Sequence, residues 1–389
     1  MITAKVKDTC PVCELADVVE FVQILQVPAH CNLLYPQRAA AIAAPSGDIH
    51  LGYCRNCDHV FNRTFDPSLM VYTQDYENSL HFSPRFQSYA KGLVEKLVNR
   101  YNLRGKDVID IGAGKGDFLI MLCEAGENRG IGFDPSYVPG PEAEAENVTF
   151  VQDFYSKKYT SYAADFIACR HVLEHIETPR DFVASVRSAV GGRTETIVFF
   201  EVPNVLYTLR DMGIWDIIYE HCSFFSPHSL SYLFQESGFE VLDVTAVFGG
   251  QFLTIESQLA SETAEPDSHD SIAPLVDAFA ESYNHKVASW QQQLGQIVAD
   301  GRKAVVWGAG SKGVTFLNIL KSKDMISYVV DINPRKGGMF VAGTGQQIVP
   351  PEFLKEYRPD VVVIMNGNYQ DEIQKTLEEM GLESEILLA

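Results

Sequence analysis

The stretch "GKDVIDIGAGKGDFLIMLCEAG", residues 105–126, says most about the fold. It opens with an apolar run of strand length, continues with Gly112, Gly114 and Gly116 at alternate positions, and ends with the apolar spacing of an amphipathic helix. Glycines in such a turn let the backbone approach a ligand and expose the N–H groups that begin the helix. The stretch therefore predicts a strand, a ligand-binding turn and a helix.

Strands and helices keep alternating on both sides of this stretch. "SPRFQSYAKGLVEKLVNRYNL" has helical spacing and begins with the start signal Ser83-Pro84. "RGIGFDP", "VTFVQDFY", "ADFIAC" and "ETIVFFEVP" are of strand length, and "RDFVASVRSAV" between the last two is helical. Such alternation predicts an α/β fold with a largely parallel, doubly wound sheet.

A second unit of the same kind follows the polar break "SETAEPDSHDSIAP". We expect a helix over roughly 272–300 and then a strand–turn–helix in "RKAVVWGAGSKGVTFLNIL". Gly308 to Gly313 fit G-x-G-x-x-G, and Asp331 follows at about the spacing seen in dinucleotide sites. This turn could bind a nucleotide, or the fold could be retained for packing or substrate contact.

The first 60 residues hold five of the eight cysteines. The pairs "CPVC" and "CRNC" place Cys10, Cys13, Cys54 and Cys57 as two knuckles whose four thiolates could converge on Zn²⁺. A four-Cys set leaves no open position, so a zinc ion here would be structural. The possible replacement ligands are Cys31, His30, His50 and His59.

Composition limits the function classes. The chain has 389 residues, enough for two or three domains, and its 51 acidic against 31 basic residues give a net charge of −20. That charge disfavours nucleic acid and anionic membranes as partners. No signal peptide or membrane span is visible, so we expect a cytoplasmic protein. The expected organisation is a zinc-binding module over 1–75, a Rossmann-like core over 76–260, and a helical linker with a second Rossmann-like domain over 261–389.

The first glycine turn resembles the S-adenosylmethionine site of class I methyltransferases. Asp110 opens a D-x-G-x-G-x-G pattern, and "QDF" follows the third strand. The resemblance implies that Asp134 holds the ribose, Asp153 meets the adenine amino group, and Phe154 packs near the base. The predicted cofactor set is Asp110, Gly112, Gly114, Gly116, Asp134, Asp153, Phe154 and His171; a nicotinamide cofactor or an empty fold are the alternatives.

"IIYEHCSFF" follows the strand that ends near Asn204. Loops that leave the carboxyl ends of parallel strands line the ligand crevice, so Tyr219, Glu220 and His221 are candidates for catalysis. The ordinary pKa of histidine lies near working pH, which suits His221 as a general base. A hydrogen-bonded structural histidine is the alternative. His171 and His175 in "RHVLEHI" could share a helical face, but the H-E-x-x-H pattern of a zinc helix is absent.

Taken together, these motifs resemble the sugar C-methyltransferases of deoxysugar biosynthesis. The four-Cys module, the core with "HVLEHI" and "YEH", and the C-terminal "GAGSKG" domain occur in the same order over nearly the whole chain. The resemblance implies methylation of a carbon beside the ketone of a nucleotide-linked 4-keto-deoxysugar. His221 would be the base, with Glu220 and Tyr219 beside it. His175 would contact the sugar or enolate, and Tyr76 would be an active-site tyrosine.

The implied mechanism needs no metal. His221 would remove the proton beside the ketone, donors such as His175 would stabilise the enolate oxygen, and the carbon would attack the sulfonium methyl in line. An O- or N-methyltransferase, an NAD-dependent oxidoreductase centred on Gly308–Gly313, and a zinc-ribbon interaction module are the competing hypotheses. Gly114-Lys115-Gly116 differs from the N-D-G usual in sugar-methylating members, so the identity of the substrate stays open. The oligomeric state is also left open by the sequence.

Overall fold

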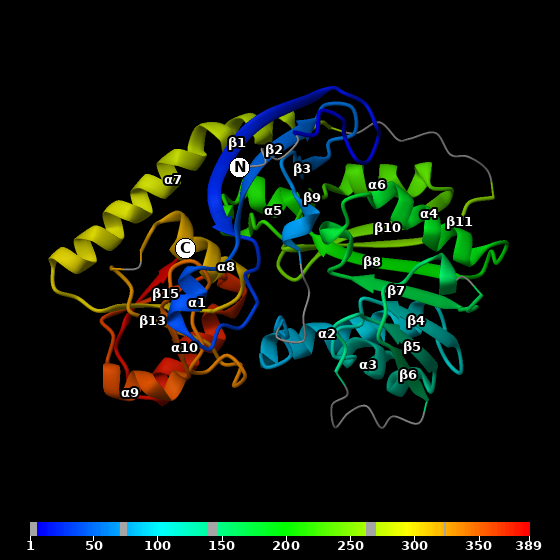
Figure 1. Cartoon of the computed structure of the whole chain (residues 1–389). Helices are drawn as coiled ribbons and strands as arrows, with labels where there is room; N and C mark the ends of the chain where they lie inside the picture. Colours follow the sequence, from blue (N-terminus) through cyan, green and yellow to red (C-terminus); the bar gives the residue numbers. More distant parts are fainter. Residues whose placement is uncertain (1–5, 71–75, 139–146, 160, 262–269, 323) are drawn as a thin grey trace.

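The protein contains three β-sheets (Figure 1). The computed structural model describes residues 6–70, 76–138, 147–159, 161–261, 270–322 and 324–389. A four-stranded sheet carries the N-terminal segment, a seven-stranded sheet forms the middle of the chain, and a five-stranded sheet forms the C-terminal part. The predicted α/β class with two Rossmann-like units is confirmed.

The seven-stranded sheet is mostly parallel. Its spatial order is β10-β11-β8-β7-β4-β5-β6, and only β10 and β11 run antiparallel to their neighbours. The strands are β4 (Asp107–Ile111), β5 (Arg129–Phe133), β6 (Val148–Val151), β7 (Phe166–Arg170), β8 (Ile197–Pro203), β10 (Phe239–Val247) and β11 (Phe252–Leu259).

Helices cover both faces of this sheet. The apolar residues of α2 and α3 pack in one hydrophobic cluster, and those of α4 and α6 pack in another on the opposite face. As predicted, α2 begins at Ser83-Pro84, where the Ser83 hydroxyl accepts the Phe86 N–H at 3.2 Å. The helices are α2 (Pro84–Arg100), α3 (Asp117–Gly126), α4 (Pro179–Val190), α5 (Val205–Arg210) and α6 (Pro227–Glu236).

The strand order reverses between β4 and β7. From β4 the chain steps outward through β5 and β6, and it then returns to build β7 and β8 on the other side. Ligands of doubly wound sheets bind at the carboxyl ends of the strands at such a switch point. Two segments start there: the glycine turn after β4, and the "HVLEH" segment after β7.

The C-terminal sheet is entirely parallel and has its own switch point between β12 and β15. Its strands are β12 (Ala304–Trp307), β13 (Tyr328–Val330), β14 (Gln347–Val349), β15 (Val361–Ile364) and β16 (Glu385–Leu388). Its helices are α8 (Ser311–Ile319), α9 (Leu354–Tyr357) and α10 (Gln370–Glu379). The expected linker helix is confirmed as α7 (Ala273–Ala299), the long helix at the upper left of Figure 1.

The N-terminal sheet takes a strand from the middle of the chain. Its order is β1-β2-β3-β9, all antiparallel: β1 (Val18–Pro28), β2 (Ser46–Cys54), β3 (Val60–Asn62) and β9 (Ser223–Phe224), with the short helix α1 (Arg38–Ile42) between β1 and β2. A single hydrophobic cluster then runs from β1 through α7 into β12 and α8. The predicted boundaries at 75 and 260 stay predictions; β9 lies beyond the first of them and still belongs to the N-terminal sheet.

The described residues also form short 3-10 helices: η1 (Pro67–Leu69), η3 (Lys157–Tyr159), η4 (Leu173–His175), η5 (Ile214–Asp216), η6 (Pro351–Phe353) and η7 (Gly367–Tyr369). His171 and His175 would share a face only if their stretch were α-helical, and it is not. His171 has a φ of +54° and precedes η4, so the two rings leave the backbone from different conformations. Among the described residues no helix is both long enough and apolar enough to cross a membrane.

Candidate active site

The turn after β4 requires glycine. Gly112, Gly114 and Gly116 have φ values of +74°, +57° and +92°, a region that other residues rarely adopt. A Cβ at Gly112 would lie 2.1 Å from the Val172 side chain, and one at Gly116 would lie 2.3 Å from the Phe150 ring. At Gly114 the space around a Cβ is open. The turn therefore presents bare backbone where a ligand can approach.

Asp134 lies at the end of β5 beside this turn. Its Oδ2 accepts the Gly114 N–H at 2.9 Å, and its Oδ1 accepts the Ser136 N–H at 2.7 Å. A carboxylate at this position is suited to the two hydroxyls of a ribose. Asp110 lies at the end of β4 and is buried, and this burial raises its pKa to about 7.

The "QDF" segment, which holds Asp153 and Phe154, follows β6. Asp153 Oδ2 accepts the Tyr159 hydroxyl at 2.6 Å and the Lys158 ammonium at 3.1 Å, so part of this carboxylate is already engaged. Phe154 is 64% exposed, although a large aromatic side chain is normally covered. Its ring is therefore free to pack against a planar group.

The "HVLEH" segment follows β7. His175 Nδ1 lies 2.9 Å from the backbone oxygen of Glu220, and because a carbonyl only accepts, Nδ1 carries a proton. His171 Nε2 lies 2.7 Å from Glu201 Oε1. Burial lowers the pKa of His171, but Glu174 and Glu201 outweigh it and raise that pKa to about 9.

His221 lies against His175, with their ring centroids 4.9 Å apart and their planes at 74°. Burial, with a smaller contribution from His175, lowers the pKa of His221 to about 3, so its imidazole is neutral at ordinary pH. Its Nδ1 is buried and has no hydrogen-bond partner among the described residues. A neutral imidazole with a free nitrogen can accept a proton.

The other two residues of the triplet point elsewhere. The Tyr219 ring packs on Phe65, and its hydroxyl accepts the Asp66 N–H at 2.8 Å, inside the N-terminal module. Glu220 is fully buried, and its Oε2 accepts the Cys31 N–H at 2.9 Å. Burial opposes ionisation of Glu220, yet the hydrogen bonds to its carboxylate keep its pKa below the ordinary value.

A cavity of about 300 Å³ lies between the middle and C-terminal domains. Of the predicted catalytic residues, His221, His175 and Tyr76 line it, as does His171. Tyr219 and Glu220 are not among its described lining residues, so the triplet contributes one side chain directly. Residues that sequence reasoning did not single out for the site also line it: Glu174, Asn204, Tyr207, Gln251, Asn333 and Lys336.

The second glycine turn faces the same cavity. Gly308, Gly310 and Gly313 are among its lining residues. Asp331 Oδ2 accepts the Ala309 N–H at 2.9 Å, just as Asp134 bonds to the first turn. Lys336 Nζ donates to the Ala309 oxygen at 3.1 Å, and Lys312 forms an ion pair with Asp216 of η5. The cavity therefore takes in the second glycine turn, whereas Gly112, Gly114 and Gly116 of the first turn are not among its described lining residues.

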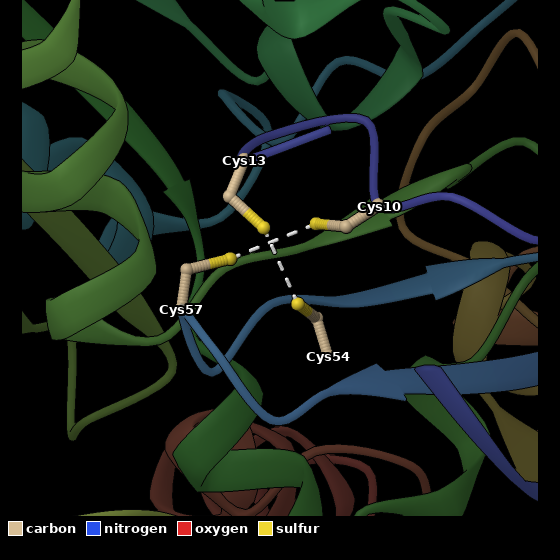
Figure 2. Close-up of side chains that lie close together, drawn as sticks. All are labelled: Cys10, Cys13, Cys54 and Cys57. Carbon is tan, nitrogen blue, oxygen red and sulfur yellow. Dashed lines mark hydrogen bonds between the residues drawn. The ribbon is translucent and has the colours of Figure 1, made fainter. Parts of the chain in front are cut away.

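The four cysteines converge (Figure 2). The Cys10 and Cys57 Sγ atoms are 3.6 Å apart, and those of Cys13 and Cys54 are 3.4 Å apart. All four lie within 4.8 Å of one another. Zn–S bonds of ~2.3 Å in a tetrahedron place sulfurs about 3.8 Å apart, so the set fits Zn²⁺. Among the described residues, none of the replacement ligands Cys31, His30, His50 and His59 joins this cluster.

Two family models match the chain. Residues 85–244 match a methyltransferase domain, and residues 255–385 match a C-methyltransferase C-terminal domain. The C-methyltransferase NovU of Streptomyces niveus is 26% identical over 390 residues, which cover 94% of this chain and 91% of that protein.

Solved structures give weaker likenesses. Magnesium protoporphyrin IX methyltransferase of Synechocystis PCC 6803 with bound SAH is 19% identical, covers 45% of this chain and 84% of its own, and has a TM-score of 0.36. The 1,6-didemethyltoxoflavin-N1-methyltransferase of Burkholderia thailandensis is 15% identical, covers 54% and 99%, and also has a TM-score of 0.36. Scores this low carry no argument, so the assignment rests on the family models and NovU.

The chain is an S-adenosylmethionine-dependent methyltransferase. More particularly, it is a C-methyltransferase, in which the methyltransferase domain is followed by the C-terminal domain of that class and preceded by a four-Cys cluster. The predicted resemblance is confirmed. The oxidoreductase and interaction-module hypotheses are therefore set aside.

Proposed function

We propose that this enzyme methylates a carbon beside the ketone of a nucleotide-linked 4-keto-deoxysugar. The observation that carries the proposal is the neutral imidazole of His221 in a cavity that the methyltransferase domain shares with the C-terminal glycine turn. A carbon beside a ketone becomes nucleophilic only when a proton leaves it, so a general base must reach that carbon. The resemblance to sugar C-methyltransferases and the NovU relative support the same reaction.

The cofactor would lie over the first glycine turn. Asp134 would hold its ribose, Gly114 would allow close backbone approach, Asp153 would meet its adenine amino group and Phe154 would pack on its base; the Asp134–Gly114 bond, the open space at Gly114 and the exposed Phe154 ring support these roles. When bound, S-adenosylmethionine supplies an electrophilic methyl group on a sulfonium. Asp110 is buried at the end of β4, directly before the turn.

His221 acts as the base. It takes the proton from the carbon beside the ketone, and the electron pair of that C–H bond moves into the enolate. His175 faces the same cavity, and because its Nδ1 proton is committed to the Glu220 carbonyl oxygen, its Nε2 edge contacts the sugar or the enolate. Tyr76 lines the cavity from the N-terminal side, where it can orient the sugar.

Glu220 and Tyr219 support the base through the backbone. Glu220 fixes the chain beside it by accepting the Cys31 N–H, and its own carbonyl orients His175. Tyr219 anchors the same segment to the N-terminal module through the Asp66 N–H. We therefore give both residues positioning roles rather than contact with the substrate.

The nucleotide end of the substrate would lie against the C-terminal domain. There the cavity is lined by the turn from Gly308 to Gly313 and by Asn333, Lys312 and Lys336. Backbone N–H groups and lysines favour phosphate oxygens, which the chain's net charge of −20 would otherwise repel. Lys312 pairs with Asp216 and Lys336 with Asp331, so a bound phosphate would compete with these carboxylates for the two lysines. The four cysteines would hold a structural zinc ion away from this cavity.

The test is a screen of nucleoside diphosphate 4-keto-deoxyhexoses with S-adenosylmethionine, read by mass spectrometry in H₂O and in D₂O. We expect a gain of one methyl group with loss of one carbon-bound hydrogen. Methylation that retains every carbon-bound hydrogen would indicate O- or N-transfer and would overturn the proposal. The His221→Ala variant is the control for chemistry at this site.

A further inference from the structure

We propose that Glu174 is a positioning residue for the base, because its carboxylate stabilises the imidazolium that His221 becomes when it takes the substrate proton. This inference rests on the function proposed above and adds a residue to it. Glu174 lies in η4 directly before His175, and it lines the shared cavity.

The placement of Glu174 is specific. Its side chain is 1% exposed. A carboxylate oxygen of Glu174, a ring nitrogen of His175 and a ring nitrogen of His221 all lie within 4.8 Å of one another. Its backbone oxygen also accepts the Cys222 N–H at 2.9 Å, which holds the chain after His221 against η4. Glu174 thus touches the base segment through its backbone and faces the base with its carboxylate.

One oxygen of this carboxylate is unused. Oε1 lies 3.6 Å from His171 Nδ1, whereas Oε2 has no hydrogen-bond partner among the described residues. A buried carboxylate oxygen without a partner is unfavourable, so its retention calls for a group that needs it during the reaction. Glu220, the other buried carboxylate near the base, is instead engaged by Cys31 and His30.

The charge balance identifies that group. The ionisable groups whose charges act on His221 are His175, Glu174, Glu220 and His171, and the two other histidines disfavour a positive charge on it. Proton abstraction breaks the C–H bond, leaves the electron pair in the enolate and places the proton, with its positive charge, on His221. A carboxylate at this distance offsets that charge in a buried site. After methyl transfer leaves the neutral thioether, the proton returns to solvent.

The experiment isolates proton abstraction. Enzyme, S-adenosylhomocysteine and a nucleoside diphosphate 4-keto-deoxyhexose are incubated in D₂O, and exchange of the hydrogen beside the ketone is followed by NMR. We expect exchange in Glu174→Gln to be roughly 100-fold slower than in wild type, in the range of general-base contributions. Affinity for S-adenosylhomocysteine should stay within about twofold. Glu177→Gln, a change two residues beyond His175 at an exposed ion pair with Lys7, should exchange like wild type.

A second variant separates charge from shape. Glu174→Asp keeps the charge and shortens the side chain, whereas Glu174→Gln keeps the shape and removes the charge. If the proposal is right, the Glu174→Asp variant keeps part of the wild-type exchange rate, whereas the Glu174→Gln variant does not. If Glu174→Gln exchanged as fast as Glu174→Asp or faster, Glu174 would have a packing role, and the proposal would be overturned.

Two further outcomes are informative. If wild type exchanges no hydrogen on any ketosugar of the panel, the proposed function fails, whatever Glu174 does. If wild-type enzyme binds a second metal ion besides the four-Cys site, and Glu174→Gln loses it, the Glu174–His175–His221 cluster is a metal centre. That result would also overturn the present proposal.

Discussion

Replacing Gly116 by alanine should damage the cofactor site by an amount that follows from its geometry. Gly116 has a φ of +92°, and left-handed backbone costs an L-residue about 1–2 kcal/mol. The new Cβ would lie 2.3 Å from Phe150 Cζ, and the Phe150 ring is stacked on Tyr137 at 4.2 Å, so it has little room to retreat. Overpacking of this kind adds about 1–3 kcal/mol.

The sum predicts a loss of about 2–5 kcal/mol in the free energy of unfolding, a large part of the ~5–15 kcal/mol typical of a domain. Urea unfolding followed by circular dichroism measures this loss, and calorimetric titration with S-adenosylhomocysteine measures the accompanying loss of affinity.

Two other glycines serve as matched controls. Gly114→Ala introduces the backbone strain alone, because its Cβ meets nothing within 4 Å. This variant should lower the free energy of unfolding by about 1–2 kcal/mol and weaken cofactor binding. Gly92→Ala lies within α2 with open space around it, and it should stabilise by roughly 0.5–1 kcal/mol. If Gly116→Ala unfolded no more easily than Gly114→Ala, the argument from the Phe150 contact would be wrong.

The remaining predictions concern the base, the cofactor, the metal and pH. His221→Ala should abolish methyl transfer while S-adenosylhomocysteine still binds; full residual activity would remove His221 from the base role. Asp134→Ala should weaken S-adenosylmethionine at least ~10-fold by calorimetry, because lost hydrogen bonds from a charged group are each worth about 1.5–3 kcal/mol, and an unchanged dissociation constant would refute the ribose assignment. Cys54→Ser should lose the zinc measured by plasma mass spectrometry and lower the unfolding temperature, whereas retained zinc would contradict the four-thiolate site. The pKa of His171 is raised to about 9, so protonated His171 should stabilise the fold by on the order of 3 kcal/mol below pH 6.5, and this contribution should be lost as pH rises through 9. In urea unfolding, the free energy of unfolding of His171→Asn should therefore depend less on pH over this window than that of wild type.

Local pattern predicted the parts of the fold that short-range physics determines. The glycine turn, the Ser83-Pro84 helix start and the span of α7 follow from backbone conformation, capping and periodicity, and all three were confirmed. The convergence of the four cysteines follows from their knuckle spacing, because each pair needs only a tight turn to present two sulfurs. The 3-10 conformation of η4 was not predicted, since the run "HVLEH" has helical composition and tertiary contacts override it.

Long-range geometry could not be read from the same patterns. Tyr219, Glu220 and His221 are neighbours in sequence, yet one points into the N-terminal module, one bonds to Cys31, and one faces the cavity. Glu174 could have been noticed, because a carboxylate directly before a candidate histidine at a strand end is a usable signal. The contribution of the second glycine turn depends on how two domains dock, and no local pattern encodes that docking.

The pairing of β9 with β3 has a consequence for engineering. His221 is separated from β9 by a single residue, so the segment that carries the proposed base is paired into the N-terminal sheet, the same sheet in which Cys54 ends β2. A chimaera that exchanged the first 75 residues for those of a relative would need a strand that pairs with β9 as β3 does, because otherwise the segment that carries the imidazole would lose this support. The N-terminal module thus supports the segment that carries the proposed base and cannot be exchanged independently of it. Recombination of this chain should preserve the pairing of Val60–Phe61 with Ser223–Phe224.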